Sequence, residues 1–343
     1  MDETQPLLEI EDLSVVFRSG GFASRRKTRV HAVSNVSLRI AEGETVALVG
    51  ESGSGKSTIG KAVCGLVPYE GRIRLAGQDL GSFTGRRSTS AARLRQMVFQ
   101  DPYSSLDPTM PVDEIIAEPL RRLEKMRQAQ RQAKVADLLD AVQLPRSFAH
   151  RLPAELSGGQ RQRVAIARAI AIEPPLVICD EAVSALDVST QRGVIELLEK
   201  LRTERNLAYL FISHDLSVVR SVADRVAVMY FGSLVEEGPT EAVFSDPAHP
   251  YTKALLEAAP IPDPRRQRQR TRATVRGELP DPTRPPSGCS FHPRCPSAME
   301  ICRTAAPRET TLDSRVAVRC HLHLDPPVGA ADEVAERETV GPR

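Results

Sequence analysis

Hydrophobic residues recur along this chain in two patterns that predict β-strands of two kinds. Apolar and polar residues alternate in Val36–Ile40 and in Arg72–Leu75, as in antiparallel strands with one buried face. Unbroken apolar runs instead predict strands that are buried on both faces, as in a parallel sheet. These runs occupy residues 45–49, 176–179, 208–212 and 226–230. The last run continues through Gly232-Ser233 into residues 234–237, which predicts a β-hairpin.

Helical spacing replaces the strand patterns between residues 112 and 144. Apolar residues there lie on helical faces with Arg, Gln and Lys between them. They are Leu120, Leu123, Val135, Leu138, Leu139 and Val142. A shorter helix is predicted from about Lys56 to Cys64, where Gly65 ends it. The pattern therefore predicts an α/β core that carries an antiparallel β element at its front and a helical insertion.

The segment from Gly50 to Thr58, GESGSGKST, lies between a buried strand and this short helix. Its glycines allow the backbone to turn tightly and to point N–H groups at phosphate oxygens. Lys56 is expected to reach the outer phosphates, and the Ser57 hydroxyl is expected to bind Mg²⁺. The loop predicts ATP or GTP as the first ligand to consider.

Two further segments fit a nucleotide site. The apolar run 176–179 ends in Asp180 and Glu181; we expect Asp180 to hold Mg²⁺ through water and Glu181 to polarise the attacking water. Residues 156–160, LSGGQ, precede a helical run, so their N–H groups form a second anion-binding element. A second such element makes sense if it completes the nucleotide site of a partner subunit.

Composition excludes several classes of function. Charged residues are 26% of the 343 residues and the formal net charge is +2, so no strongly charged partner is implied. Tryptophan is absent and aromatic residues are 4%, which argues against a nucleic-acid partner bound by base stacking. The N-terminus lacks the apolar core of a signal peptide, and no apolar run approaches the roughly 18–20 residues that a membrane-spanning helix needs. Any role at a membrane is therefore expected to be performed from outside the bilayer.

The ordered motifs resemble those of the ATP-binding subunit of an ABC transporter over roughly residues 7–238. The set comprises GESGSGKST, Gln100, LSGGQ, LVICDE, Ser184-Ala185-Leu186-Asp187 and His214. The resemblance implies an ABC-type ATPase of the α/β class with a P-loop, RecA-like core. It implies that Glu181, His214 and Gln100 act in catalysis. Mg²⁺ would be bound by Ser57, Gln100 and Asp180.

The resemblance also implies two sets of ATP-binding residues. The first binds ATP within the subunit and comprises Phe17, Gly50, Glu51, Ser52, Gly53, Ser54, Gly55, Lys56, Ser57 and Thr58. The second binds the ATP of the partner subunit and comprises Ser157, Gly158, Gly159, Gln160 and Asp187. Phe17 would stack on adenine, and His214 would contact the γ-phosphate.

Two longer segments are similar to the oligopeptide/dipeptide importer ATPases. They are Val98–Pro108 and Ala248–Leu256. Tyr103 and the unmodified LSGGQ resemble the second of the two ATPases that such importers pair. The family implies a peripheral subunit at the cytoplasmic face of the cell membrane that powers import of di- or oligopeptides.

The implied partners are a second ABC ATPase subunit in a heterodimer or a homodimer, two transmembrane permease subunits and an extracellular or periplasmic solute-binding protein. Two alternatives stay open at this point. The same machinery could import nickel, glutathione or another small solute. A soluble ABC ATPase of DNA repair is the other alternative, although long coiled coils, zinc knuckles and tandem cassettes are absent from this sequence.

Four of the six cysteines crowd into the end of the chain. Cys289, Cys295, Cys302 and Cys320 have the spacing C-x5-C-x6-C-x17-C, without the C-x2-C pairs of most zinc domains. Their thiols suit an iron–sulfur cluster, zinc or no metal, and the resemblance to the importer ATPases favours a [4Fe–4S] cluster. Cys64 and Cys179 lie in apolar contexts and are expected to be core thiols.

These patterns divide the chain into two parts. Residues 1–246 form the expected nucleotide-binding domain, with a helical subdomain at about 101–165. Residues 247–343 form a small Cys-rich C-terminal extension with the four-Cys segment at 289–320. Within the extension, 260–264 is expected to be a stiff connector, 265–272 a solvated basic linker, and the part after His323 disordered.

Overall fold

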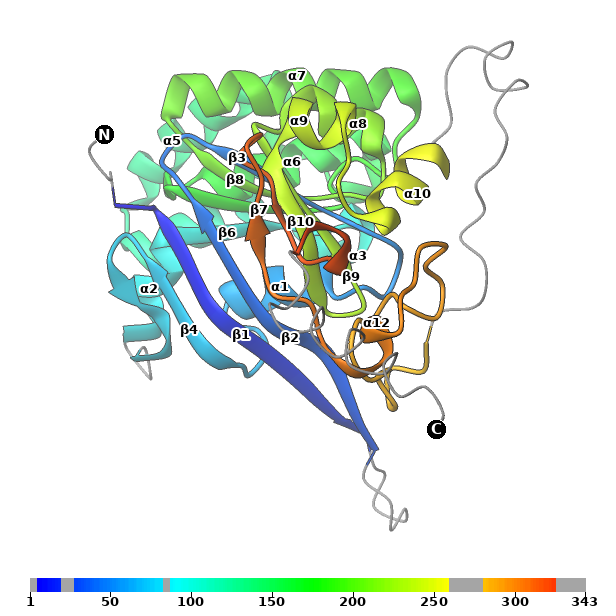
Figure 1. Cartoon of the computed structure of the whole chain (residues 1–343). Helices are drawn as coiled ribbons and strands as arrows, with labels where there is room; N and C mark the ends of the chain where they lie inside the picture. The colour runs from blue at the N-terminus through cyan, green and yellow to red at the C-terminus, as the bar shows by residue number, and fades with distance from the viewer. Residues whose placement is uncertain (1–4, 20–27, 83–86, 259–279, 325–343) are drawn as a thin grey trace, which may run out of the picture.

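Two β-sheets of different kinds form the framework of the computed structural model, which describes residues 5–19, 28–82, 87–258 and 280–324 (Figure 1). The smaller sheet is antiparallel, in the order β2-β1-β4-β5. Its strands are β1 (Leu8–Ser19), β2 (Thr28–Ile40), β4 (Glu70–Leu75) and β5 (Gln78–Asp79). The alternating segments predicted as antiparallel strands, 36–40 and 72–75, lie in β2 and β4.

The larger sheet has the order β11-β12-β10-β9-β3-β8-β7-β6. Neighbouring strands from β9 to β6 are parallel, and the strands on the other side of β9 are antiparallel. The bounds are β3 (Thr45–Val49), β6 (Arg95–Val98), β7 (Leu176–Asp180), β8 (Ala208–Ile212), β9 (Arg225–Tyr230), β10 (Ser233–Pro239), β11 (Thr310–Thr311) and β12 (Ala317–Val318). The four strands predicted from unbroken apolar runs and the β9–β10 hairpin are confirmed.

Helices cover both faces of the larger sheet and form the insertion. The α-helices are α1 (Lys56–Val63), α2 (Arg87–Leu94), α3 (Pro102–Ser105), α4 (Val112–Pro119), α5 (Gln128–Ala141), α6 (Gly158–Ile170), α7 (Val188–Arg205), α8 (Leu216–Val222), α9 (Thr240–Ser245), α10 (Pro250–Ala258) and α12 (Ile301–Thr304). Shorter 3-10 turns are η1 (Leu80–Ser82), η3 (Arg146–His150), η4 (Pro153–Glu155) and η5 (His321–His323), and η2 (Leu120–Glu124) is a π-helical turn.

The strand β3 shows why an unbroken apolar run is needed here. Val46 and Leu48 pack into a core shared with the antiparallel sheet and α1. Ala47 and Val49, which point to the opposite face, pack into a core shared with the inserted helices and α7. Because both faces of the strand are covered, every side chain along it is buried.

The described C-terminal residues join the larger sheet. β12 pairs with β10 in antiparallel register, with Val318 opposite Glu236 and Ala317 opposite Glu237. Phe291 and Val316 are also buried in the larger core. The residues predicted as a stiff connector and a basic linker, at 260–264 and 265–272, lie outside the described residues, and so does the tail predicted after His323, apart from Leu324.

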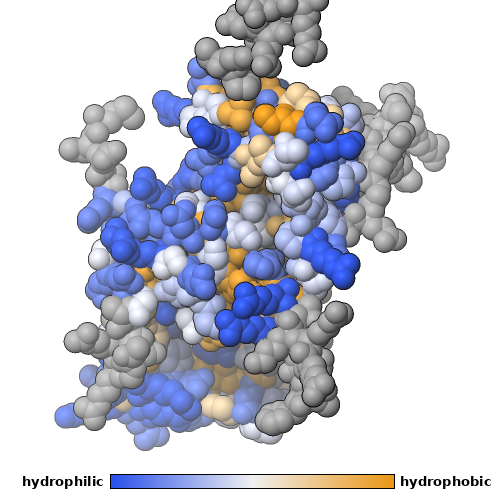
Figure 2. All heavy atoms as spheres, turned by 60° about the horizontal axis from the view of Figure 1, so that its bottom comes forward, coloured by the Kyte–Doolittle hydropathy of each residue, from blue (hydrophilic) through white to orange (hydrophobic). Residues whose placement is uncertain are grey.

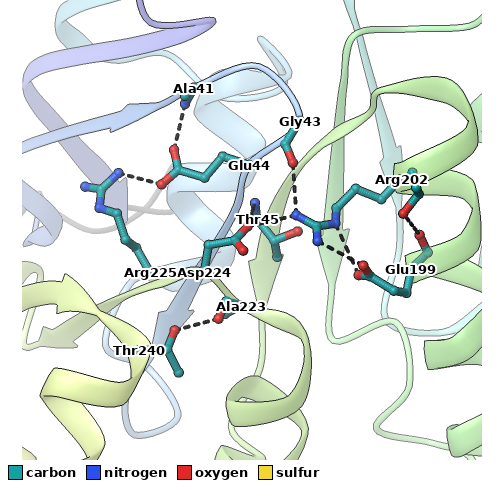
Figure 3. A network of polar contacts seen from close by, with 11 residues as sticks. Ala41, Gly43, Glu44, Thr45, Glu199, Arg202, Ala223, Asp224, Arg225 and Thr240 are labelled. Atoms are coloured by element: carbon teal, nitrogen blue, oxygen red, sulfur yellow. Dashed lines mark hydrogen bonds and ion pairs between the residues drawn. The ribbon is translucent and has the colours of Figure 1, made fainter. Parts of the chain in front are cut away.

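A polar network fixes the amino ends of β3 and β9 (Figure 3). The carboxylate of Asp224 accepts hydrogen bonds from the Thr45 N–H at 2.8 Å and from Arg202 at 2.9 Å. Arg202 also donates to the Gly43 carbonyl oxygen at 3.0 Å. Beside it, Glu44 pairs with Arg225 at 3.0 Å. These contacts fasten α7 and β9 to the start of β3, at the end of the strand opposite the glycine-rich loop.

The surface carries scattered hydrophobic residues. Figure 2 shows a face that is mostly hydrophilic, with hydrophobic residues in separate patches. Exposed large hydrophobic side chains among the described residues are Phe17, Leu66, Tyr103, Leu152, Val188, Met299, Ile301 and Leu322. In the described part of the chain, no helix combines the length and the apolar character that crossing a bilayer requires.

Candidate active site

The predicted phosphate-binding loop connects the carboxyl end of β3 to α1. Lys56 is only 5% exposed, and its Nζ donates to the carbonyl oxygens of Gly50 and Glu51, each at 2.8 Å. Burial lowers the pKa of Lys56, while the carboxylates of Glu181, Asp180 and Glu51 act to raise it. The loop therefore wraps around a single buried ammonium group, at the amino end of a helix.

The glycines of the loop are required by its backbone path. Gly50 and Gly55 have φ angles of 149° and 106°. A Cβ atom at Gly50 would lie 2.1 Å from the Met229 carbonyl oxygen, and one at Gly55 would lie 2.3 Å from the Ala32 carbonyl oxygen. Neither position accepts a side chain, so the tight turn that aims backbone N–H groups toward a phosphate depends on glycine.

Ser57 and Asp180 meet beside this loop. The Ser57 hydroxyl donates to Asp180 Oδ1 at 2.7 Å, which joins the first turn of α1 to the end of β7. Burial raises the pKa of Asp180, and the Ser57 hydrogen bond opposes this effect. A hydroxyl and a carboxylate side by side offer the oxygen ligands that Mg²⁺ prefers, so these two residues fit the predicted magnesium site.

Glu181 lies between two other predicted catalytic residues. Gln100 Nε2 donates to Glu181 Oε2 at 2.6 Å, and His214 Nδ1 lies 3.2 Å from Glu181 Oε1. Gln100 follows β6, Glu181 follows β7 and His214 follows β8, so parallel strands deliver all three to one edge of the sheet. Glu181 also has a φ of 48°, in the left-handed region that a glutamate rarely adopts.

The segment Ser157–Gln160 begins a different helix, α6. Ser157 Oγ accepts a hydrogen bond from the Gln160 N–H at 3.4 Å, and Gln160 Oε1 accepts one from the Ser157 N–H at 2.9 Å. This capping box satisfies the first turn of α6. Gly158 lies in that turn, and a Cβ at Gly159 would lie 2.2 Å from Thr190 Cγ2. The second predicted anion-binding element is thus a well-formed helix start.

Asp187 and Phe17 lie in separate parts of the molecule. Asp187 begins α7, where its carboxylate accepts bonds from the N–H and hydroxyl groups of Ser189 and Thr190. Those hydrogen bonds, led by the one from the Ser189 hydroxyl, hold the pKa of Asp187 below its usual range. Phe17 lies on β1 with 40% of its surface exposed, so its ring is free to contact another molecule.

The remaining predicted loop residues take up defined places. Ser54 is buried, and its carbonyl oxygen accepts a bond from the Gly232 N–H at 2.9 Å. Thr58 lies in the first turn of α1, where its N–H donates to the Gly55 carbonyl oxygen. Ser52 and Gly53 are exposed, and a Cβ at Gly53 would meet no atom within 4 Å. The outer side of the loop is open to a ligand.

The structure does not support the predicted iron–sulfur cluster. Within residues 5–19, 28–82, 87–258 and 280–324, no group of three or more His, Cys, Asp or Glu side chains is arranged to hold a metal ion. Burial raises the pKa of the Cys289, Cys295 and Cys320 thiols. The [4Fe–4S] cluster that the family resemblance favoured for Cys289, Cys295, Cys302 and Cys320 is therefore wrong. Cys179 is fully buried and Cys64 partly so, as expected of core thiols.

Two residues near the site were missed from the sequence. Arg294 forms a two-pronged ion pair with Glu51 of the loop, at 3.0 and 3.2 Å. The hydroxyl of Tyr251 accepts a hydrogen bond from the Glu51 N–H at 2.9 Å. One signal could have indicated Arg294: an acidic residue inside an anion-binding loop requires a compensating basic partner.

Family models match two parts of the chain. Residues 33–184 match the ABC transporter family. Residues 235–302 match the family described as oligopeptide/dipeptide transporter, C-terminal region. Together the two matches include all of the residues placed above at the carboxyl edge of the larger sheet except His214.

Relatives match almost the whole chain. A probable peptide ABC transporter ATP-binding protein of Sinorhizobium fredii is 46% identical over 95% of this chain and 92% of its own length. Oligopeptide transport ATP-binding proteins of Bacillus subtilis and Escherichia coli are each 46% identical, over 93% and 88% of this chain and 98% and 92% of their own lengths. Their names mention no iron–sulfur cluster.

A solved structure supports the same fold. A dimeric ATP-binding cassette with bound ADP and phosphate is 29% identical, with a TM-score of 0.61 over 68% of this chain and 98% of that one. The fold is therefore that of an ABC ATPase cassette. The chain belongs to the family of ATP-binding proteins of oligopeptide and dipeptide ABC transporters.

Proposed function

We propose that this chain is the subunit of a peptide ABC importer that hydrolyses ATP to ADP and phosphate and so powers translocation of di- or oligopeptides. The names of its relatives and the match to the transporter C-terminal family support the peptide cargo over nickel, glutathione or another small solute. The same relatives argue against a soluble ATPase of DNA repair.

The observation that carries the ATPase proposal is the position of Glu181 between Gln100 and His214. A carboxylate that accepts a hydrogen bond from an amide and faces an imidazole is held in one orientation. We assign it the role of general base toward the attacking water. Gln100 orients that carboxylate and the water, and His214 contacts the γ-phosphate.

The loop residues bind and orient the triphosphate. Backbone N–H groups from Gly50 to Thr58 and the Lys56 ammonium neutralise the phosphates, and the Lys56 amine exchanges its two carbonyl partners for phosphate oxygens. Ser57, Asp180 and Gln100 would hold Mg²⁺, which would neutralise negative charge on the outer phosphates. Catalysis in this arrangement comes from positioning and electrostatics, with water as the nucleophile.

A second ABC ATPase subunit, different from this chain or identical to it, completes each site. Ser157, Gly158, Gly159, Gln160 and Asp187 act on the ATP bound by that partner. They begin α6 and α7, whereas the phosphate-binding loop begins α1. Phe17 stacks on the adenine of the ATP held by its own subunit, for which its exposed ring is suited.

The remaining partners and the location follow from the importer assignment. Two transmembrane permease subunits and an extracellular or periplasmic solute-binding protein complete the transporter. The chain itself works as a peripheral subunit at the cytoplasmic face of the membrane. The division into a nucleotide-binding domain at 1–246, with its helical part at about 101–165, and an extension at 247–343 stays a prediction.

The decisive experiment measures uptake of a labelled dipeptide and a labelled tetrapeptide by cells that produce the complete transporter. Glu181→Gln in this subunit is expected to abolish uptake while the complex still assembles. Glu204→Gln, on the exposed face of α7, is the matched control and is expected to leave uptake unchanged. Unimpaired peptide uptake with Glu181→Gln would refute the assignment.

A further inference from the structure

The C-terminal segment reaches the phosphate-binding loop through Arg294. Its two terminal nitrogens bind the two carboxylate oxygens of Glu51 at 3.0 and 3.2 Å. The Arg294 side chain is 8% exposed and that of Glu51 26%, so the pair is largely shielded from water. A two-pronged pair of this kind fixes the direction of the carboxylate as well as its charge.

A cluster of aromatic rings holds Arg294 in place. Tyr230, Tyr251 and Phe291 are at most 1% exposed, and their ring centroids lie 4.7 to 5.4 Å apart. The Arg294 N–H donates to the Phe291 carbonyl oxygen at 3.0 Å, so the arginine and the ring belong to one turn. Tyr251 in turn accepts the Glu51 N–H at 2.9 Å. Both the backbone and the side chain of Glu51 are therefore fixed from outside the loop.

A free carboxylate at position 51 would oppose the function of the loop. ATP brings several negative charges to this loop, and a nearby carboxylate repels them. Glu51 also acts on Lys56, since its charge is one of three that raise the pKa of that amine. Unless another cation holds the Glu51 carboxylate, it competes with phosphate for Lys56.

We propose that Arg294 is a positioning residue for ATP: it binds the Glu51 carboxylate, keeps it from Lys56 and removes its repulsion of the triphosphate. This inference rests on the proposed function, because it presumes that the loop binds ATP. It makes the C-terminal segment a working part of the nucleotide site.

The test measures binding of Mg-ATP to the full-length chain by titration calorimetry. Arg294→Ala is expected to weaken binding about tenfold, because it leaves a charged partner unpaired beside the ligand. Arg294→Lys keeps the charge but not the two-pronged geometry. Its affinity for Mg-ATP is expected to lie between those of the wild type and Arg294→Ala. Adding Glu51→Gln to Arg294→Ala is expected to restore most of the affinity. Arg319→Ala, which breaks the ion pair with Glu309 in the same segment, is the matched control.

The outcomes separate a positioning role from a structural one. If the double variant binds as weakly as Arg294→Ala, the loss comes from damaged packing and the proposal is wrong. Equal affinity of the wild type and Arg294→Ala also overturns it. A wild-type chain that fails to bind Mg-ATP instead overturns the proposed function, and this inference with it.

Glu51→Gln alone decides the matter if Arg294→Ala does not fold. It keeps the shape of the side chain but leaves the Arg294 charge uncompensated near the triphosphate, so ATP is expected to bind about threefold more tightly. Weaker or unchanged binding in this variant contradicts the proposal.

Discussion

The two ends of β3 are held by different kinds of contact. At the amino end, Asp224 accepts the buried Thr45 N–H, and Arg202 compensates its charge. At the carboxyl end, the chain turns through Gly50 at a φ of 149° and encloses the Lys56 amine between carbonyl oxygens. One end satisfies its polar groups with permanent partners. The other keeps charged groups in contacts that a phosphate can replace.

Stability and chemistry therefore depend on opposite ends of β3. Charged and polar groups that have permanent partners within the protein stabilise the native state. Groups that bind a ligand lack part of their partners until the ligand binds. Glu181, which follows β7 at the same edge of the sheet, has a φ of 48°, so this edge carries backbone strain.

Replacing His214 by Ala tests the edge of the sheet at which the strands end and the chemistry is proposed. The side chain is 58% exposed and faces Glu181, so its loss removes a contact to the reacting groups with little loss of packing. We expect kcat for ATP hydrolysis to fall about 100-fold, with the Tm unchanged. Steady-state kinetics of the assembled transporter and thermal unfolding of the chain measure the two quantities. A clear fall in Tm would mean that His214 also stabilises the fold, so that stability and chemistry are not separated between the two ends of the sheet.

Replacing Asp224 by Ala tests the other end. The Thr45 N–H is buried and would lose its acceptor, and Arg202 would lose one carboxylate. We expect the free energy of unfolding to fall by about 2 kcal/mol, while ATP affinity stays the same. Chemical denaturation followed by circular dichroism, together with ATP titration, provides the measurement. A marked loss of ATP affinity would contradict the separation of roles.

The pH dependence of stability tests His249, which lies between the sheet and the C-terminal segment. Burial, and then the nearby His323, lowers the pKa of His249 to about 3, from an ordinary value of 6.5. Below pH 6.5 the unfolded chain therefore binds a proton that the folded His249 does not, so stability falls as the pH falls. From about pH 7 to about pH 5.5 the loss is expected to be about 1 kcal/mol.

A matched variant isolates this contribution. Burial raises the pKa of Glu236, whose contribution to stability has the opposite sign and is lost as the pH rises. His249→Asn keeps an acceptor for the Tyr251 N–H and removes the titrating ring. The wild type should therefore lose more stability on acidification than the variant does. Parallel curves for the two proteins would show that His249 has no part in the effect.

The smallest effect is expected at Glu44. Replacement by Gln keeps an acceptor for the Ala41 N–H but removes the ion pair with Arg225. Because Arg225 retains Glu237 as a partner, we expect a loss of about 0.5 kcal/mol in the free energy of unfolding. Denaturant midpoints in low and high salt would measure it. A loss as large as that of Asp224→Ala would show that the network depends on Glu44 instead.

Local patterns were enough to predict most of the sheet. The run 45–49 has no polar interruption except Thr45 at its start, because both faces of β3 are covered. The motifs at Lys56, Asp180 and Glu181 could also be recognised from the local sequence, since each lies within a few residues of the strand that positions it. Sequence reasoning works where the residues that cooperate are close along the chain or follow neighbouring parallel strands.

Contacts between residues far apart in the sequence, and the spatial arrangement of individual side chains, were not predictable from local patterns. Arg294 and Glu51 are 243 positions apart, and no local pattern links them. The cysteine spacing and the family resemblance suggested a cluster, but neither shows how the thiols are arranged in space, and no metal-binding group is found in the described part of the chain. The left-handed backbone of Glu181 was equally hidden, because a glutamate does not favour that conformation.

The pairing of β12 with β10 has a consequence for shortened forms of this chain. A protein that ended before residue 280 would leave the backbone of β10 without its neighbour at Glu236 and Glu237. An open strand edge of this kind recruits strands from other molecules and leads to aggregation. Anyone who trims the chain to a minimal cassette for crystallisation should therefore expect an insoluble product, unless residues up to at least Val318 are retained.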